Sequence, residues 1–388
     1  MDLRGGNLLG RWKHRFSECS DMALQFYFDR TERLEYTTRE ERETYDLDFQ
    51  HCFPLFDRHE IVWGMGYRAT MDEIGNSEFF GLEPDERALS TYSAFVQDKV
   101  SIVRDCLSLT VGSKFEEHDY TGFEYQPTGK ILWTPSKKHT FWASVTRAVR
   151  TPARFDHDII FTPAIFQAGP TLMKLDYYGD KDFKSETVIA EELGYRHQAS
   201  DDLSIDIAGF FNEYDNLATY ESGVPFFSTS PVPHMVLPRT RDHLMKGETY
   251  GGECVVNWDV MEDWRLTGVY SYIRMQLHTD AASTNPTRDE EDEGRVPRNI
   301  FHLNSRIDLF EDVELDTSLF YVDNLPTPNI SNYLRFDARL GWHITDGTEL
   351  SLSVENLFDP QHPENISRQA FSATEVERSI FLKLTCRF

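Results

Sequence analysis

Apolar and polar residues alternate with a period of two along most of this chain of 388 residues. The last ten residues show it most clearly. One face carries Ile380, Leu382, Leu384, Cys386 and Phe388, and the other carries Ser379, Phe381, Lys383, Thr385 and Arg387. Period two is the repeat of a β-strand whose two faces meet different environments. About 17 such segments follow one another, starting near residues 7, 21, 44, 59, 89, 106, 121, 138, 185, 202, 249, 264, 299, 312, 332, 349 and 377. The pattern therefore predicts an all-β fold.

The predicted connections mostly alternate between short and long. Short ones include 17–20, 54–58, 135–137, 199–201, 259–263 and 345–348, and long ones include 31–42, 69–88, 149–184, 215–248, 278–298 and 358–374. Only the short connection 117–120 departs from this rule. Short turns at one end and long loops at the other are typical of outer-membrane barrels, whereas sandwiches and propellers have no reason to segregate loop length. We predict a transmembrane antiparallel up-and-down β-barrel of about 16–17 strands.

Composition and motifs exclude several other classes. No stretch of about 18 apolar residues is free of charges and breakers, which argues against membrane-spanning helices. The 39 Lys and Arg against 65 Asp and Glu give a net charge of −26, and this argues against a nucleic-acid partner. The five cysteines form no C-x-x-C pair, so no metal site or disulfide framework is predicted. No G-x-S-x-G or H-E-x-x-H motif is present, and we predict neither an enzyme nor a bound cofactor.

The C-terminus itself suggests a signal for barrel assembly. Ile380, Leu382, Leu384 and Phe388 form an apolar row that ends on an aromatic residue. A strand of this kind is what outer-membrane barrels present to their assembly machinery, because a barrel must close to remove its free edges. The expected partners are therefore the barrel assembly machinery and outer-membrane lipid.

Five short segments, in order, resemble elements of TonB-dependent outer-membrane receptors. Thr-Arg-Ala-Val-Arg-Thr-Pro at 146–152 resembles the stretch that leaves a barrel strand into a long outer loop. The others are Gly-Asp-Lys-Asp-Phe-Lys-Ser-Glu at 179–186, Glu-Leu-Gly-Tyr-Arg at 192–196, Phe-Asn-Glu-Tyr-Asp-Asn-Leu at 211–217, and Val-Glu-Asn-Leu-Phe-Asp at 354–359. The resemblance covers residue 7 to the terminus and is clearest from residue 121.

The resemblance implies a receptor in the outer membrane of a Gram-negative bacterium. Such receptors take up scarce nutrients, most often ferric siderophores, with energy delivered by TonB. The family carries an N-terminal plug, a TonB box and a barrel of about 22 strands. We find no plug-like segment, so we expect residues 1–388 to form one partial barrel domain, an N-terminally truncated 22-strand barrel. TonB is an expected partner only if a plug and a TonB box lie upstream.

Two predicted outer loops carry aromatic and cationic residues that can grip an iron chelate. The predicted loop 161–178 and the predicted loop 220–246 supply the candidates for ligand binding, which are Phe166, Tyr177, Tyr178, Phe226, His234 and Arg239. Two acidic stretches have the residue types of cation sites. Asp156, His157 and Asp158 are adjacent, and the run 289–293 is wholly acidic. For both, a solvated loop is the favoured interpretation.

Two further classes of function stay open from the sequence. One is a passive porin-like or structural outer-membrane barrel, which shares the strand pattern but needs no plug. The other is a soluble secreted β-rich protein that binds or cleaves glycans, since alternation alone also describes a sheet with one solvated face.

Overall fold

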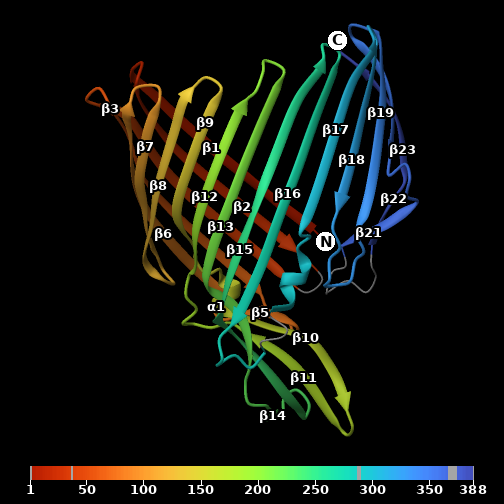
Figure 1. The fold of residues 1–388 in the computed structure, drawn as a ribbon. Coiled ribbons are helices and arrows are strands. Elements are labelled where there is room, and N and C mark those ends of the chain that lie inside the picture. The colour runs from red at the N-terminus through yellow and green to blue at the C-terminus, as the bar shows by residue number, and fades with distance from the viewer. Residues whose placement is uncertain (1, 36–37, 286–289, 366–373, 388) are drawn as a thin grey trace.

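In the computed structural model, which describes residues 2–35, 38–285, 290–365 and 374–387, 17 strands of one curved 21-stranded sheet form a wall. Neighbours in the wall are antiparallel and follow chain order, as in an up-and-down barrel (Figure 1). The wall strands are β1 (Asp2–Ser17), β2 (Ser20–Leu34), β3 (Arg39–Leu55), β4 (His59–Gly75), β6 (Glu86–Val103), β7 (Leu107–His118), β8 (Gly122–Ser136), β9 (His139–Arg150), β12 (Glu186–Gln198), β13 (Leu203–Ser222), β15 (His234–Met261), β16 (Trp264–Thr279), β17 (Asn299–Phe310), β18 (Val313–Val322), β19 (Tyr333–Thr345), β20 (Thr348–Glu355) and β23 (Ser379–Cys386).

The predicted number and order of strands are confirmed. Within the described residues β1 pairs only with β2, and β23 pairs only with β20, so each has one unpaired edge. Several strands begin within one residue of the predicted position, among them β4, β12 and β16. The largest difference is β15, which begins at His234 rather than near residue 249.

The segregation of loop lengths is also confirmed. Short turns join strands at one end of the wall, for example at 18–19, 137–138 and 262–263. The other end, at the bottom of Figure 1, carries the long connections. The short connection at 119–121 lies at this second end, as the sequence predicted.

The predicted loops 161–178 and 220–246 are largely strands. The correction is that β13 and β15 run far past the wall, and that the two predicted loops form additional strands, two in the first and one between β13 and β15. Twenty-eight residues at about 3.3 Å each reach roughly 90 Å, several times the height of an apolar band. The elements outside the wall are α1 (Arg154–Asp158), β5 (Phe80–Leu82), β10 (Ile159–Ala168), β11 (Thr171–Tyr178), β14 (Phe226–Ser228), the 3₁₀ helix η1 (Glu291–Arg295), β21 (Gln361–Asn365) and β22 (Thr374–Glu377).

These extra strands extend the sheet beyond the rim of the wall. β10 pairs antiparallel with β5 and with β11, and β11 pairs in parallel with the first half of β15. β14 pairs with the same part of β15. We call this assembly, residues 72–88, 118–121, 150–186 and 215–246, the loop layer.

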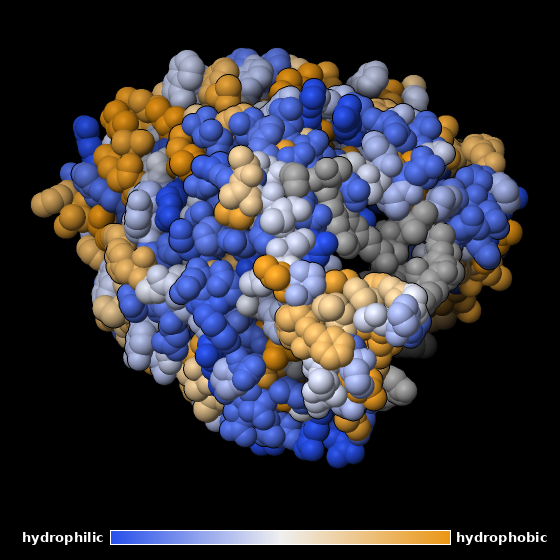
Figure 2. Space-filling view, turned by 90° about the horizontal axis from the view of Figure 1, so that it is seen from below, coloured by the Kyte–Doolittle hydropathy of each residue, from blue (hydrophilic) through white to orange (hydrophobic). Residues whose placement is uncertain are grey.

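Most buried side chains of the described residues belong to the loop layer rather than to the wall. The buried apolar residues Ile74, Leu82 and Ile159 form a cluster against which Phe80 and Phe161 pack. The wall exposes large apolar side chains instead, such as Leu193 at 67%. Viewed from the loop layer, hydrophilic residues dominate the centre of the face, and hydrophobic residues gather mostly toward the perimeter (Figure 2). Among the described residues, no helix has the length and apolar character needed to cross a membrane.

Candidate functional site

A network of buried charges centred on α1 holds the loop layer together. Asp158 has a fully buried side chain and receives three donors: Arg154 Nε at 3.1 Å, Lys181 Nζ at 2.6 Å and the Tyr120 hydroxyl at 3.0 Å. Arg87 Nη1 lies a further 3.5 Å from the same carboxylate. These residues come from four separate segments of the chain, so one carboxylate fastens four segments.

Arg154 forms a second branch of this network. Its guanidinium donates to the Asp72 carboxylate and to the backbone carbonyls of Pro84 and Asp85. The side chain is only 6% exposed. A buried guanidinium is tolerated when carboxylates and carbonyls satisfy its donors, as they do here. Arg154 thereby joins α1 to the connection between β4 and β6.

Asp156 joins α1 to the extended part of β15. Its carboxylate lies 2.6 Å from Arg241 Nε and 3.1 Å from Arg150 Nη1, and it accepts the backbone N–H of Ala153 at 2.9 Å. Arg241 also donates to the Tyr220 hydroxyl at 2.7 Å. Aromatic rings surround this guanidinium at 5.0–5.8 Å, and they belong to Phe155, Phe183 and Tyr220. Cation–π contacts of this kind gain strength where water is excluded.

The titration of these groups follows from burial and from their partners. Burial opposes the charged form of Asp158, but the donors Lys181, Arg154 and Tyr120 outweigh it and hold its pKa below the ordinary value. Burial, the largest cause, raises the pKa of Tyr120 to about 12. Burial lowers the pKa of His157, whose ring stacks on Tyr120 with centroids 3.9 Å apart. The network is therefore built for an ionised Asp158 and a neutral His157 near neutral pH.

The sequence predicted a solvated loop for residues 156–158, and this prediction is wrong. Asp156, His157 and Asp158 are 2%, 4% and 2% exposed. Their carboxylates are occupied by cations of the protein, so they do not form a metal site either. The reason is tertiary: the cations that pair with them come from segments up to 85 residues away in sequence.

The acidic run 289–293 also differs from the predicted solvated loop. Asp289 lies outside the described residues. Glu290 accepts the backbone N–H of Thr279 at 3.1 Å, and Glu293 accepts that of Leu277 at 2.5 Å. Glu290 and Glu293 therefore cap the end of β16, whereas Glu291 and Asp292 between them are exposed, as the predicted solvated loop would have them.

All six residues predicted to bind ligand lie in the small sheet of the loop layer. Phe166 is in β10, Tyr177 and Tyr178 are in β11, and Phe226 is in β14. His234 and Arg239 are in β15. The register places Tyr177 beside Arg239 across the parallel β11–β15 pair. The structure therefore brings the six into one region, although it does not test whether they bind a ligand.

These residues differ in how accessible they are. Phe166 is 45% exposed and Phe226 is 48% exposed, so both are available to a ligand. His234 is buried, and its Nδ1 lies 2.7 Å from the carbonyl of Val232.

The remaining three are engaged within the loop layer. Arg239 donates to the Ser222 hydroxyl. Tyr178 donates to Asp176 at 3.2 Å, and burial raises its pKa to about 12. The ring of Tyr177 packs edge-on against Tyr220 at 4.9 Å, which connects it to Arg241 and the charge network.

Sequence reasoning missed Arg154, Asp72 and Arg241 as organising residues. Arg154 and Asp72 are 82 positions apart, and no local pattern links them. The spacing of four between Arg154 and Asp158 is the one local signal, since it is the spacing of an ion pair on a helical turn.

The predicted assembly signal lies on β23. Ile380, Leu382 and Leu384 are 68%, 72% and 61% exposed and face the same side of the sheet. In the register they lie opposite Val354, Leu352 and Leu350 of β20, which continues the apolar row. Phe388 lies outside the described residues, and the role of this row in assembly stays a prediction.

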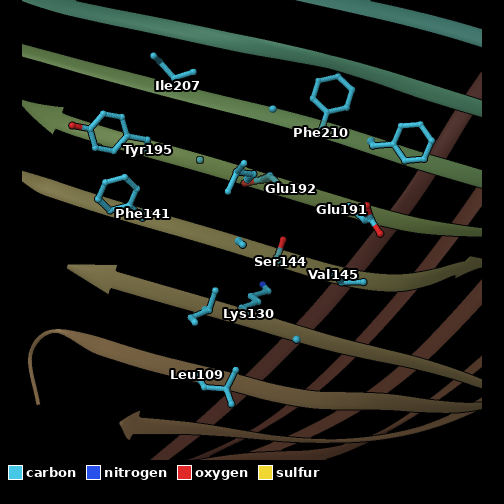
Figure 3. Close-up of a pocket in the computed structure, with 17 residues that line it drawn as sticks. Leu109, Lys130, Phe141, Ser144, Val145, Glu191, Glu192, Tyr195, Ile207 and Phe210 are labelled. Carbon is cyan, nitrogen blue, oxygen red and sulfur yellow. The ribbon is translucent and has the colours of Figure 1, made fainter. Parts of the chain in front are cut away.

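A broad hollow of the described structure lies on the wall rather than in the loop layer (Figure 3). It crosses β7, β8, β9, β12 and β13, with Leu109, Phe141, Val145, Tyr195 and Ile207 among its lining residues. The hollow exists because small residues occupy the register positions between bulky ones, namely Gly129, Ala143 and Gly209. It holds no convergent polar set and is no candidate for chemistry.

The wall, its short turns and the packed loop layer define an outer-membrane type of β-barrel. Residues 5–357 match the family described as TonB dependent receptor-like, beta-barrel. The chain therefore belongs to the TonB-dependent receptor-like β-barrel family, as the sequence motifs predicted, and is a β-barrel of the Gram-negative outer membrane.

The similar proteins are distant in sequence. The chain is 21% identical over 280 residues to the iron-regulated outer membrane virulence protein of Vibrio cholerae, a match that covers 70% of this chain and 41% of that protein. The siderophore receptor PirA of Acinetobacter baumannii has the same fold, with a TM-score of 0.78 at 15% identity, over 100% of this chain and 62% of that one. The ferric-catecholate import receptor Fiu of E. coli gives 0.73 at 13% identity, over 99% and 64%. The chain thus spans less than two thirds of the length of each of these proteins.

Proposed function

We propose that this chain is the barrel part of a receptor that captures a scarce nutrient, most readily a ferric siderophore, for uptake energised by TonB. The observation that carries the proposal is the membership of residues 5–357 in the TonB-dependent receptor-like barrel family. The similar structures named as siderophore receptors support the choice of ligand. The family and the similar proteins are receptors and transporters, which favours transport over catalysis.

The loop layer supplies the chemistry for capture. Phe166 and Phe226 offer exposed aromatic faces, and Arg239 carries a cationic group in the same small sheet. Ferric chelates are often anionic and aromatic, so a cation beside aromatic rings is a suitable surface for them. The buried network around Asp158 keeps these strands in place while a ligand binds and leaves.

The remaining parts of the proposal concern partners. We infer that outer-membrane lipid covers the apolar outer face of the wall, and that the barrel assembly machinery inserts it through β23. TonB requires a plug and a TonB box, so residues 1–388 take part in the cycle only as the barrel of a chain that also carries those parts.

The test is uptake of radioactive iron by iron-starved cells that carry the complete gene. Cells are given ferric catecholates or ferric hydroxamates, and both binding in the cold and uptake in the warm are measured. We expect one class to be taken up in a TonB-dependent manner. Uptake that persists without TonB would instead establish a passive pore, and a failure to bind either class would refute siderophore capture.

Variants of the loop layer locate the capture surface. The double change Phe166→Ala and Phe226→Ala is expected to weaken cold binding by about tenfold or more, because two stacking faces of about 1 kcal/mol each are lost. The matched control is Phe310→Ala at the opposite end of the wall, where the side chain is 73% exposed. An equal loss of cold binding in both variants would show that the capture surface does not include Phe166 and Phe226.

A further inference from the structure

Asp180 and Asp242 are half-buried carboxylates of the loop layer, and they lack the Lys or Arg partner that the fully buried carboxylates of the layer have. Among the described residues, the buried carboxylates of this layer pair with Arg or Lys: Asp72 with Arg154, Asp156 with Arg150 and Arg241, Asp158 with Arg154 and Lys181, and Asp176 with Lys174. No Lys or Arg of the described chain lies within ion-pair distance of Asp180 or Asp242. The nearby cations Lys181, Arg241 and Lys246 are directed to other carboxylates.

Asp180 and Asp242 converge on a histidine from segments about 60 residues apart. The ligating atoms of Asp180, Asp242 and His243 all lie within 4.8 Å of one another. Asp180 lies in the turn after β11, where its Oδ1 accepts the backbone N–H of Asp182 at 3.0 Å. Asp242 Oδ1 lies 3.3 Å from His243 Nδ1 and accepts the backbone N–H of His243 at 2.7 Å. Each of these oxygens accepts one backbone hydrogen bond and keeps a second lone pair, so each carboxylate can still bind another partner.

A break in the strand pairing explains how two successive residues of β15 reach one point. Leu217 of β13 is opposite Met245, and Thr219 is opposite Asp242. Two steps along β13 thus correspond to three along β15, which is a β-bulge on β15. In a regular strand Asp242 and His243 would point to opposite faces of the sheet. The bulge re-aims one of them, as bulges do next to functional sites.

The imidazole of His243 supplies the second sign of a missing ligand. Its Nδ1 is a buried atom that makes no well-aligned hydrogen bond among the described residues, although Asp242 Oδ1 lies 3.3 Å away. The ring of Phe183 packs edge-on against it, with centroids 6.1 Å apart. Buried polar atoms without a protein partner are uncommon, and a bound ion or an ordered water molecule often satisfies them.

We propose that Asp180, Asp242 and His243 bind one divalent transition-metal ion of the zinc class. Two carboxylate oxygens and one imidazole nitrogen match the donors that zinc takes, whereas calcium prefers oxygen alone. Tetrahedral zinc with bonds of about 2.1 Å spaces its ligands about 3.4 Å apart, close to the 3.3 Å between Asp242 Oδ1 and His243 Nδ1. Water completes the coordination.

The ion would fasten the turn after β11 to β15. It would thus act as a structural clamp on the small sheet that carries Tyr177 and Arg239, and the inference does not depend on which nutrient the receptor takes up. The clamp complements the charge network, which reaches the same turn through Lys181. We expect zinc to order this turn without changing the wall.

The test is zinc retention by the detergent-solubilised protein. Its cysteines are first alkylated, because thiolates also bind zinc, and EDTA removes any metal. After dialysis against micromolar ZnCl2, elemental analysis should find one zinc per chain, and dialysis against CaCl2 should leave no calcium. Asp180→Asn, Asp242→Asn and His243→Gln are each expected to reduce zinc to background. The matched control Asp182→Asn changes the same charge two residues away and should keep the ion.

Limited proteolysis supplies a second readout that does not depend on retention. Zinc should slow cleavage of the natural protein within residues 179–185 at least several-fold. It should not change the rate of cleavage in the His243→Gln variant. Heat-modifiable migration on a gel shows that each variant still forms its barrel. Three results would each overturn the proposal. They are a zinc content of the natural protein no higher than background, retention of calcium in place of zinc, and a loss of zinc in Asp182→Asn equal to that in the three ligand variants.

Discussion

The wall and the loop layer are built on opposite principles. In the wall, 16 antiparallel pairings satisfy the backbone, and most side chains stay partly exposed on one face or the other. In the loop layer, buried side chains add cross-links to the strand pairings: Asp158, Arg154 and Asp156 tie α1, which belongs to no strand, to the segments around it. The same chain therefore uses a repeating backbone ladder in one region and a single, unrepeated network in the other.

This difference determines how each region responds to change. A ladder of backbone hydrogen bonds spreads its stability over many similar bonds. Changing one side chain therefore lowers the free energy of unfolding only a little, unless the change places a charged group against the lipid hydrocarbon. A buried network concentrates stability in a few groups, and removing one partner leaves a charge without compensation. The following changes are ordered from the largest expected effect to the smallest.

Arg154→Ala should have the largest effect on the loop layer. It removes the partner of the buried Asp72 and one partner of Asp158, and breaking a buried pair in this way costs about 3–5 kcal/mol. Hydrogen exchange should show lost protection in residues 150–186 while the wall stays protected. If protection were lost equally across both regions, the two would not be separate cooperative units.

Leu193→Arg tests the wall by placing a charge on its apolar outer face. Leu193 lies near the middle of β12, in register with Ala143 and Gly209. A cation facing lipid near the bilayer midplane costs about 2–4 kcal/mol. Refolding into lipid vesicles measures this free energy. Ser144→Arg on the polar face is the control, and similar costs for both would contradict the assignment of faces.

Asn356→Ala probes the end of the wall where β20 leaves it. Asn356 is fully buried with φ of +56°, a conformation that Asn and Gly adopt most easily. Its Nδ2 donates to the carbonyl of Val376. We expect a loss of about 1–3 kcal/mol in the free energy of unfolding. Asn356→Gly keeps the backbone conformation and should recover part of the loss in denaturant titrations.

Acid should loosen the loop layer before the wall. Burial lowers the pKa of His157 below its ordinary value of 6.5, so the unfolded layer binds a proton that the folded layer resists. Stability therefore falls as pH drops below about 6.5, and the lowered pKa of Asp158 adds a further loss at more acidic pH. Hydrogen exchange at pH 7.5 and pH 5.5 measures this slope. His157→Gln should reduce this dependence of stability on pH. If the dependence were unchanged in the variant, groups other than His157 would be its cause.

Arg265→Ala should have the smallest effect. Arg265 pairs with Asp259 at 2.5 Å near a short turn, but both side chains are well exposed, at 65% and 40%. Exposed pairs of this kind contribute about 0–1 kcal/mol. Thermal melting should detect almost no change. A loss as large as that of Arg154→Ala would show that the contrast between the two regions is mistaken.

The sequence predicted the wall well because its signal is local. β4 and β16 begin at His59 and Trp264, the positions that the alternation predicted. It failed at β15, since the first half of that strand lies in the loop layer with β11 and β14, beyond the wall whose two unlike faces impose the alternation. The sequence of such a segment need not alternate between apolar and polar residues. The six candidate residues were located in the right region, but the pairing of Tyr177 with Arg239 could not be foreseen.

By itself the sequence determined the fold class, the strand order, the end that carries the long connections and the family. These properties follow from period-two alternation and from short motifs, which act between residues close in the chain. The tertiary structure alone decided that Asp156, His157 and Asp158 are buried, that Arg154 joins α1 to Asp72, and that Asp180 meets Asp242 and His243. Each of these depends on contacts between segments dozens of residues apart, and such contacts leave no periodic trace in the chain.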